Sequence, residues 1–250
     1  MQLLSGQKAI EGAVSVQEQF AQVSARNTLP VLSASFALGP PLAELAPETI
    51  ARPRLTGTLK RLMDLLIAVP AVVIALPLLL IVALLIKLDG PGPVVFRQTR
   101  LGLNGHPFGI LKFRTMNIIE DGEHVVQATR DDARITRIGA FLRAASLDEL
   151  PQLFNVIAGD MSLVGPRPHA VAHDEYYATL IPEYEQRQSV KPGITGWAQV
   201  NGLRGGTPTL DLMQRRVDLD LWYAGHASIA LDLLILLRTP FELMRRRNAY

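Results

Sequence analysis

The chain of 250 residues contains no cysteine, so disulfide bonds and thiolate metal sites are excluded. Its charge is nearly balanced, with 25 lysines and arginines against 23 acidic residues. This balance lacks the clear basic excess of a nucleic-acid-binding domain, so we expect no nucleic-acid partner. Residues 1–30 mix charged and polar side chains without a continuous apolar core, and we therefore expect no secretory signal there.

What the chain has in abundance is apolar residues. They make up 48% of the sequence, which suffices for one core and a membrane element but not for two large domains. Four prolines interrupt the segment Leu38–Pro53, a pattern typical of a linker. We therefore expect a poorly ordered N-terminal extension at residues 1–55 and a single domain at residues 56–250.

The longest apolar run spans residues 65–86 and contains no charged or strongly polar side chain. As a straight helix it would be about 33 Å long, close to the roughly 30 Å hydrocarbon core of a bilayer. One transmembrane helix is thus the simplest interpretation. However, Pro70 and Pro77 lie almost two helical turns apart, so their kinks would bend the helix in nearly the same direction.

Basic residues flank this apolar run at both ends. They are Arg52, Arg54, Lys60 and Arg61 before it, and Lys87, Arg97 and Arg100 after it. Because basic flanks favour the cytoplasmic side of a membrane, both ends are expected on that side. The sequence thus favours a re-entrant helix, bent at Pro77 and Pro70, that enters one leaflet and returns. A spanning helix and a buried helix of a soluble protein are the alternatives.

Strand and helix patterns follow the apolar run. Two strand-like segments, residues 94–98 and 108–113, flank the turn signal Asn104-Gly105 and predict a β-hairpin. Helical patterns follow at residues 130–157, 173–184, 210–224 and 230–246. The expected fold class is α+β, mainly helical. The last segment joins an apolar body to an arginine cluster, which suits an interfacial amphipathic helix and equally a terminal helix packed on the core.

Two adjacent carboxylates, Asp148 and Glu149, lie between Arg143 and Arg167. The stretch from Ser146 to Glu149 has the pattern of a capping box, in which the serine and glutamate side chains satisfy backbone N–H groups at a helix start. That structural interpretation explains the serine and the glutamate but leaves Asp148 free.

The same residues also suit phosphate chemistry. A carboxylate such as Asp148 serves as a nucleophile toward phosphorus in aspartyl-phosphate enzymes. Glu149 and Asp148 are candidate ligands of Mg²⁺, which takes one or two carboxylates plus phosphate oxygens. Arg143 and Arg167 are candidate phosphate-binding residues, because guanidinium groups neutralise phosphoryl oxygens. Together with the apolar run, this set predicts phosphate chemistry on a lipid-embedded substrate.

Residues 191–202, KPGITGWAQVNG, are rich in glycine but lack the spacing of a phosphate-binding loop. Trp197 in this stretch has three candidate roles: it could stack on a base or sugar, lie at the membrane interface, or pack in the core. The sequence leaves these roles open.

Seven motifs follow one another between Leu59 and Arg247. They are KRLMDLL at 60–66, GPVVFRQTRLGLNGHPF at 92–108, KFRTM at 112–116, DDARITRIGAFLR at 131–143, SLDELPQLFNV at 146–156, GDMSLVGPRP at 159–168 and KPGITGWAQVNG at 191–202. In these motifs the chain resembles the monotopic bacterial phosphoglycosyl transferases, also called polyprenyl-phosphate sugar-1-phosphate transferases. Their fixed order makes the resemblance far more specific than the acid pair alone.

The resemblance implies an activity and a location. Such enzymes transfer a sugar-1-phosphate from a UDP-sugar to undecaprenyl phosphate and release UMP, which begins the assembly of an exopolysaccharide or surface glycan. They have a re-entrant helix and a small catalytic body at the cytoplasmic face of the bacterial inner membrane, in contact with its lipids. We expect the transfer to pass through a covalent aspartyl phosphosugar intermediate.

The resemblance also implies roles for single residues. Asp148 falls on the nucleophile, and Glu149 falls on the residue that helps to bind Mg²⁺. Arg143 and Arg167 match the two arginines of the family motifs, and Pro77 matches the proline that breaks the membrane helix. These assignments follow from the motifs and not from spacing alone.

Some features depart from the family pattern. Leu76 stands where a serine often precedes the bend proline, and Ala133 replaces a common proline. Residues 1–55 are too short for the multi-span bundle that precedes this unit in long members, so the chain resembles the short form. Residues 191–202 look more like those of hexose-transferring members, which favours UDP-glucose or UDP-galactose as the donor.

Two other functions fit the same residues. A non-catalytic membrane-anchored adaptor would use the acid pair as a capping box and bind lipid headgroups without Mg²⁺-dependent chemistry. One-step transfer, with Asp148 and Glu149 both binding metal, predicts ternary-complex kinetics and no adduct on the protein. The sequence identifies neither the sugar nor the oligomeric state, and a homo-oligomer stays open.

Overall fold

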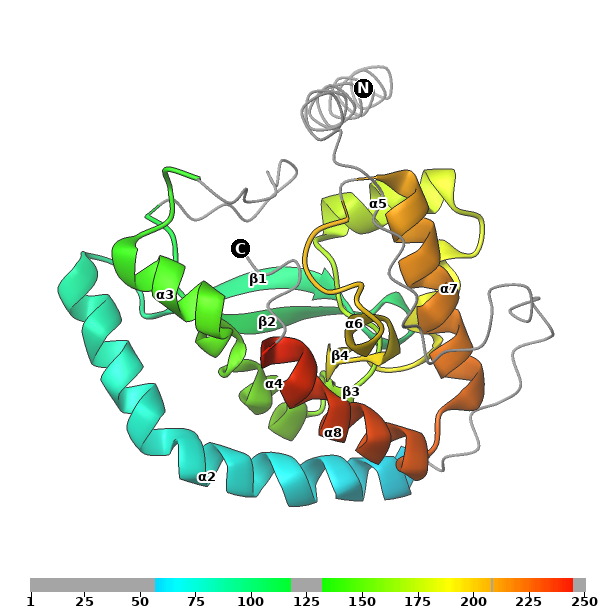
Figure 1. The fold of residues 1–250 in the computed structure, drawn as a ribbon, viewed down its shortest axis with the longest axis horizontal. Coiled ribbons are helices and arrows are strands. Elements are labelled where there is room, and N and C mark those ends of the chain that lie inside the picture. Colours follow the sequence, from blue (N-terminus) through cyan, green and yellow to red (C-terminus); the bar gives the residue numbers. More distant parts are fainter. Residues whose placement is uncertain (1–56, 118–131, 208, 245–250) are drawn as a thin grey trace.

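The computed structural model describes residues 57–117, 132–207 and 209–244 (Figure 1). The extension expected at residues 1–55 lies outside the described residues. In chain order the elements are α2 (Gly57–Asp89), β1 (Val95–Leu101), the 3₁₀ turn η2 (Leu103–Gly105), β2 (Pro107–Phe113), α3 (Arg137–Ala145), the 3₁₀ turn η3 (Leu147–Glu149), α4 (Gln152–Ala158), β3 (Ser162–Val164), α5 (Val171–Leu180), the 3₁₀ turn η4 (Tyr184–Ser189), β4 (Gly193–Thr195), α6 (Trp197–Val200), α7 (Leu210–His226) and α8 (Ile229–Met244). The prediction of a mainly helical α+β protein is confirmed for this part of the chain.

The predicted hairpin is present as the antiparallel pair β1 and β2, which runs from the Val95–Phe113 partners to the Leu101–Pro107 partners. Asn104 and Gly105 turn the chain with φ angles of 54° and 74°. Asparagine and glycine tolerate this left-handed region better than other residues, which is why the dipeptide marks the turn. Both strands are longer than the sequence pattern indicated.

The helices at the centre of the chain differ from the expectation. The pattern at residues 130–157 predicted helical structure; in the structure α3 begins only at Arg137 and ends at Ala145, and α4 begins at Gln152. Ser146 lies between them with a φ angle of 58°, which interrupts the helix, and Pro151 directly precedes α4. The acid pair therefore lies on a short turn between two helices.

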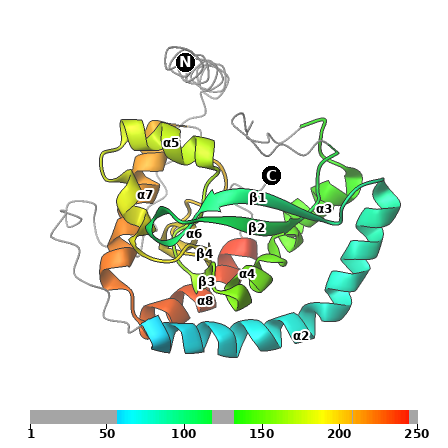
Figure 2. The ribbon, with the colours of Figure 1, turned by 180° about the vertical axis from the view of Figure 1, so that it is seen from behind.

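Helix α2 contains Pro70 and Pro77 and bends around the rest of the protein (Figures 1 and 2). Within the described residues it is the one helix long and apolar enough to cross a membrane, and only 17% of its most apolar 18-residue window is buried. This low burial argues against the core helix of a soluble protein. The re-entrant path of α2 stays a prediction, and so does the assignment of its bend to Pro70 and Pro77.

Polar contacts attach both ends of α2 to the body. Near its start, the buried carboxylate of Asp64 accepts hydrogen bonds from Ser162 Oγ at 3.0 Å and from the Leu163 amide at 3.1 Å. At its end, Arg114 Nη2 donates to the carbonyl oxygens of Ile86 at 2.9 Å and Gly90 at 2.7 Å. The guanidinium thus satisfies carbonyl groups that a helix end leaves unpaired.

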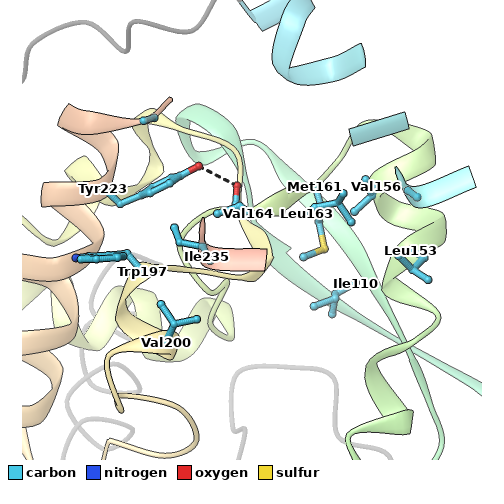
Figure 3. Close-up of a cluster of buried hydrophobic side chains, with 12 residues drawn as sticks. Ile110, Leu153, Val156, Met161, Leu163, Val164, Trp197, Val200, Tyr223 and Ile235 are labelled. Atoms are coloured by element: carbon cyan, nitrogen blue, oxygen red, sulfur yellow. Dashed lines mark hydrogen bonds between the residues drawn. The ribbon is translucent and has the colours of Figure 1, made fainter. Parts of the chain in front are cut away.

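The main hydrophobic core lies where β2, α4, β3, α6, α7 and α8 meet (Figure 3). The labelled core residues are Ile110, Leu153, Val156, Met161, Leu163, Val164, Trp197, Val200, Tyr223 and Ile235. Tyr223 donates a hydrogen bond from its hydroxyl group to the Val164 carbonyl oxygen at 3.2 Å. This core fixes α4, which follows the acid pair in the chain, and β2, which packs against the turn that carries the pair.

Trp197 belongs to this core and is 5% exposed. Its ring stacks on Trp222 at a centroid distance of 5.0 Å, and the guanidinium of Arg238 lies 5.6 Å from its centre. Of the three roles that the sequence left open, the structure therefore supports packing. A tryptophan enclosed in this way offers no free face to a base or sugar.

Candidate functional site

Asp148 and Glu149 lie on η3, the turn between α3 and α4. Ser146 has a left-handed backbone there, and its side chain caps neither η3 nor α4. Glu149 makes its contacts with basic side chains instead of a helix N-terminus. The capping-box interpretation was therefore wrong, because the serine side chain caps neither element and the Ser146 N–H donates to the Arg143 carbonyl oxygen instead of to Glu149.

Two basic side chains hold Glu149. Its carboxylate accepts a hydrogen bond from Lys112 Nζ at 2.9 Å and binds the guanidinium of Arg167 through both oxygens, one of them at 3.1 Å. Burial alone would raise the pKa of Glu149, but Arg167 and Lys112 outweigh it and hold this pKa well below its usual value. Glu149 is thus ionised across the physiological pH range.

Asp148 has the opposite environment. Within the described residues, no hydrogen bond or ion pair reaches its carboxylate. Burial and the neighbouring charge of Glu149 raise the pKa of Asp148 from its ordinary 3.8 to about 6, although Lys112, Arg143 and Arg167 act against that rise. Above this pH, the site holds an ionised carboxylate with free oxygens, and that is the form a nucleophile needs.

Arg143 lies in the last turn of α3, and its guanidinium is near the acid pair. Its Nε donates to Thr115 Oγ1 at 3.1 Å, while Nη2 lies 3.6 Å from Met116 Sδ. Gly139 allows this approach, since a Cβ atom there would lie 2.1 Å from the Thr115 carbonyl oxygen. The guanidinium is thereby held near Asp148, whose pKa it lowers, and it has no carboxylate partner of its own among the described residues.

Arg167 follows β3, near the end of the motif at residues 159–168. Its strand pairs in parallel with β4, and this pairing was not predicted. The two strands approach closely because Gly165 and Gly193 lack side chains: a Cβ on Gly165 would lie 2.2 Å from the Lys191 carbonyl oxygen. The carbonyl oxygen of Arg167 accepts a hydrogen bond from Arg187 Nη2 at 2.7 Å, and this bond holds the backbone of Arg167 in place.

The four residues proposed from sequence thus lie together, and the structure adds two that sequence reasoning missed. Lys112 comes from β2, and Arg204 comes from the loop after α6, where it donates a hydrogen bond to Ser146 Oγ. The KFRTM motif contained Lys112, but nothing in its local pattern indicated that the side chain faces the acid pair. Arg204 lay just beyond the glycine-rich stretch and had no signal.

The residues present fit a Mg²⁺ ion that also contacts substrate. Within the described residues, no three His, Asp or Glu side chains gather into a metal-binding group. Among the residues that the structure describes, the Asp148 carboxylate has no partner and Glu149 Oε2 accepts one hydrogen bond, which leaves that oxygen a free lone pair. Mg²⁺ commonly binds through one or two carboxylates plus phosphate oxygens, and this pair matches that donor set.

Comparisons with known proteins show what this chain is similar to. The family described as bacterial sugar transferase matches residues 55–246. The UDP-glucose:undecaprenyl-phosphate glucose-1-phosphate transferase of Caulobacter vibrioides is 57% identical over 191 residues, which cover 76% of this chain and 72% of that protein. The protein of the same name from Escherichia coli is 50% identical over 192 residues, which cover 77% of this chain but only 41% of that longer protein.

A further relative is matched over almost its whole length. The exopolysaccharide production protein PSS of Rhizobium leguminosarum bv. phaseoli is 46% identical over 196 residues, which cover 77% of this chain and 98% of that protein. The matched region therefore occurs both as nearly a whole protein and as less than half of a longer one.

Proposed function

Because this chain belongs to the bacterial sugar transferase family, we propose that it transfers a sugar-1-phosphate from a UDP-sugar to undecaprenyl phosphate and releases UMP. A hexose is the expected sugar, since relatives named for glucose-1-phosphate transfer reach 57% identity. Such a reaction would be the first membrane step of exopolysaccharide or surface glycan biosynthesis. The activity of the whole protein, its substrates and its partners are all part of this proposal.

One observation carries the mechanism. Asp148 is a partly buried carboxylate without a hydrogen-bond partner in the described residues, and it stands beside a carboxylate that two basic groups hold ionised. Burial and the neighbouring charge of Glu149 raise the free energy of this ionised carboxylate in the folded state, so its presence there favours chemistry over structure. Toward a phosphoryl group, such a carboxylate acts as a nucleophile.

The proposed reaction has two steps. A carboxylate oxygen of Asp148 attacks the β-phosphorus of the UDP-sugar, the bond to the bridging oxygen of UMP breaks, and the sugar-1-phosphate becomes bound to the aspartate. A phosphate oxygen of undecaprenyl phosphate then attacks the same phosphorus and frees Asp148. Arg143 and Arg167 would bind the phosphoryl oxygens. Asp148 and Glu149 would hold Mg²⁺, which when bound would neutralise charge on the donor diphosphate.

The surface of the protein suits the inner face of a bacterial inner membrane. Figures 1 and 2 show α2 and α8 along the same side of the body. Large apolar side chains are exposed on both helices, among them Val73, Ile74, Leu84, Leu88, Leu237, Phe241 and Met244. Apolar patches of this kind mark membrane or protein contacts. We propose that α2 enters the cytoplasmic leaflet as a re-entrant helix while α8 lies at the interface.

The test is UMP release by the purified full-length protein in lipid nanodiscs. The assay contains undecaprenyl phosphate, Mg²⁺ and one of several UDP-sugars, beginning with UDP-glucose. We expect release with one donor, and we expect its loss with EDTA and in the Asp148→Asn variant. Intact-protein mass measured with the donor alone should show an added sugar-1-phosphate on the wild type only.

Different results would lead to different conclusions. UMP release that needs both substrates, with ternary-complex kinetics and no adduct, would support one-step transfer. Folded, lipid-bound protein that releases no UMP with any donor would contradict the proposal and favour the membrane-anchored adaptor.

A further inference from the structure

A cavity of about 180 Å³ lies beside the acid pair. Its walls come from η3 and α4, β4, α6 and the last turns of α8. Three polar residues of the site contribute to it, and two of them are joined because Arg204 donates a hydrogen bond to Ser146 Oγ. The third is Glu149. The cavity is thus continuous with the site where the phosphoryl group would react.

Apolar side chains make up much of the remaining wall. They are Leu150, Leu153, Ile194, Val200 and Leu243, and the polar residues Thr195, Gln199, Thr239 and Glu242 complete the lining. Apolar cavities of about 150 Å³ in other proteins hold a molecule the size of benzene. A cavity of this size and lining therefore accommodates a branched group of about five carbons, the size of a single isoprene unit.

The cavity also reaches the apolar surface of the protein. Leu243 lines the cavity and is 38% exposed, and its neighbours Phe241 and Met244 are 67% and 80% exposed. An apolar chain held in the cavity would therefore leave it over the end of α8, where the protein already presents apolar side chains. No residue of α2 lines the cavity.

Charge at the inner side of the cavity matches a phosphate. Arg204 carries a positive charge, and its hydrogen bond goes to the neutral hydroxyl group of Ser146. Within the described residues, no carboxylate forms an ion pair with Arg204. Glu149 and Asp148 lie near enough to act on its charge. A guanidinium without an anionic partner at the head of an apolar cavity is suited to a phosphate attached to a hydrocarbon chain.

We propose that this cavity binds the first isoprene unit of the polyprenyl phosphate acceptor, whose phosphate group contacts Arg204 and faces Asp148. This inference rests on the function proposed above and extends it with an acceptor site. The rest of the prenyl chain then runs along the apolar residues of α8. The acceptor is held by α4, α6 and α8, and α2 contributes membrane attachment instead of the first contact with the substrate.

A competing occupant of the cavity is the sugar of the donor. Gln199 lines the cavity and is 7% exposed, and its Oε1 atom accepts no hydrogen bond within the described residues. A sugar hydroxyl group could donate to that atom. The two occupants differ in the half-reaction they serve, because the sugar binds with the donor and the prenyl chain binds with the acceptor.

The test compares two Leu→Trp substitutions at sites of similar exposure. Leu243→Trp narrows the cavity, while Leu180→Trp lies at the exposed end of α5 and serves as the control. Leu150→Phe narrows the cavity from another wall. It shows whether an effect of Leu243→Trp comes from the narrowed cavity or from a local disturbance of α8. For each full-length variant we would measure the KM for undecaprenyl phosphate, the KM for the UDP-sugar, and UMP release without acceptor. Thermal unfolding would show that each variant is folded.

We expect Leu243→Trp and Leu150→Phe to raise the KM for undecaprenyl phosphate by about tenfold or more, the scale on which apolar pockets discriminate. The KM for the donor and the acceptor-free release of UMP should stay within about twofold of wild type, because neither depends on acceptor binding. Leu180→Trp should match the wild type in every measurement.

Two results would overturn the inference while leaving the proposed function intact. The first is that the wild type is active and both cavity variants are folded, yet both keep the wild-type KM for undecaprenyl phosphate. The other is a raised KM for the donor, with a further rise in Gln199→Met, which would assign the cavity to the sugar. Failure of the proposed function looks different, because the wild type itself would then release no UMP.

Discussion

Two regions of this protein are built from the same residue types, arginine and carboxylate, and serve different ends. One is the acid-pair site around Asp148 and Glu149. The other is a buried cluster of His169, Asp174, Tyr184, Arg187 and Asp220. In the buried cluster, Arg187 Nη2 donates to Asp220 at 2.7 Å, and the Tyr184 hydroxyl donates to Asp174 at 2.7 Å.

The two regions differ in whether their carboxylates have hydrogen-bond donors. In the buried cluster each carboxylate has a donor, and burial with the nearby charges of Arg187 and Arg216 lowers the pKa of His169 well below its usual value. That histidine is neutral and structural. At the acid-pair site only Glu149 has donors, while Asp148 has none within the described residues. Charges that are fully paired stabilise the fold, whereas an unpaired carboxylate is available for reaction.

The two regions are also in contact. Arg187 belongs to the buried cluster, and its Nη2 atom donates to the carbonyl oxygen of Arg167 at 2.7 Å. The cluster therefore supports the loop that brings Arg167 to Glu149. Substitutions in each region should separate an effect on activity from an effect on stability.

The largest expected effect is the loss of activity in Asp148→Asn. An amide is no nucleophile toward phosphorus, so turnover should fall by at least about 10³-fold. The thermal midpoint should not decrease, since no described hydrogen bond depends on this carboxylate. Asp211→Asn on the exposed start of α7 is the matched control and should keep wild-type turnover. Activity of Asp148→Asn near that of the control would refute the assignment of the nucleophile.

The next largest effect should be on stability, in Arg187→Met. This substitution leaves Asp220 buried without its partner, which typically destabilises a protein by about 3–5 kcal/mol. For a chain of this size the thermal midpoint should fall by roughly 10 °C. Arg215→Met on the exposed side of α7 provides the control and should unfold like the wild type. An unchanged midpoint combined with lost turnover would instead place Arg187 in the reaction.

The sequence predicted those elements of the fold that are indicated by a local pattern of residues. The hairpin turn at Asn104-Gly105 and the helix at residues 210–224 follow from turn chemistry and periodicity. The capping-box pattern placed a helix start at Ser146, but the left-handed backbone with which this serine ends α3 has no sequence signature. The β3–β4 pair was missed as well, since three-residue strands show no alternation, and their approach depends on Gly165 and Gly193 coming together in space.

Site residues from distant segments show the same limit. Lys112 and Arg204 reach the acid pair only because β2 and the loop after α6 fold beside η3. No spacing rule relates them to Asp148, so only a structure or a family motif could have identified them. The roles of Asp148, Glu149, Arg143 and Arg167 stay predictions, and variants of Asp148 and Arg167 test two of them.

A smaller loss of activity is expected in Arg167→Lys. The lysine keeps the positive charge but cannot bind Glu149 and a phosphoryl oxygen with a planar fork. We expect kcat/KM to fall by about 10–100-fold, which corresponds to about 1.4–2.7 kcal/mol of transition-state stabilisation. Arg215→Lys should show no such loss. Equal activity of Arg167→Lys and the wild type would mean that charge alone matters at this position.

The smallest expected effect is a pH-dependent gain in the stability of Asp148→Asn, whereas most substitutions destabilise a protein. Because the folded-state pKa of Asp148 is raised from 3.8 to about 6, the folded protein holds this proton more tightly than the unfolded chain does. Its contribution to stability is therefore fully present below about pH 4, and it is lost as the pH rises through about 6. The asparagine variant does not undergo this loss.

We therefore expect metal-free Asp148→Asn in EDTA to match the wild type at pH 4 and to exceed it at pH 7.5. A shift of about two pKa units corresponds to nearly 3 kcal/mol, and partial exposure of the side chain reduces this to about 1–2 kcal/mol, or a midpoint higher by roughly 2–6 °C. Thermal unfolding in detergent at the two pH values measures the difference. If the variant and the wild type differed in thermal midpoint by the same amount at pH 4 and at pH 7.5, ionised Asp148 would not destabilise the fold. The contrast with the buried cluster would then disappear.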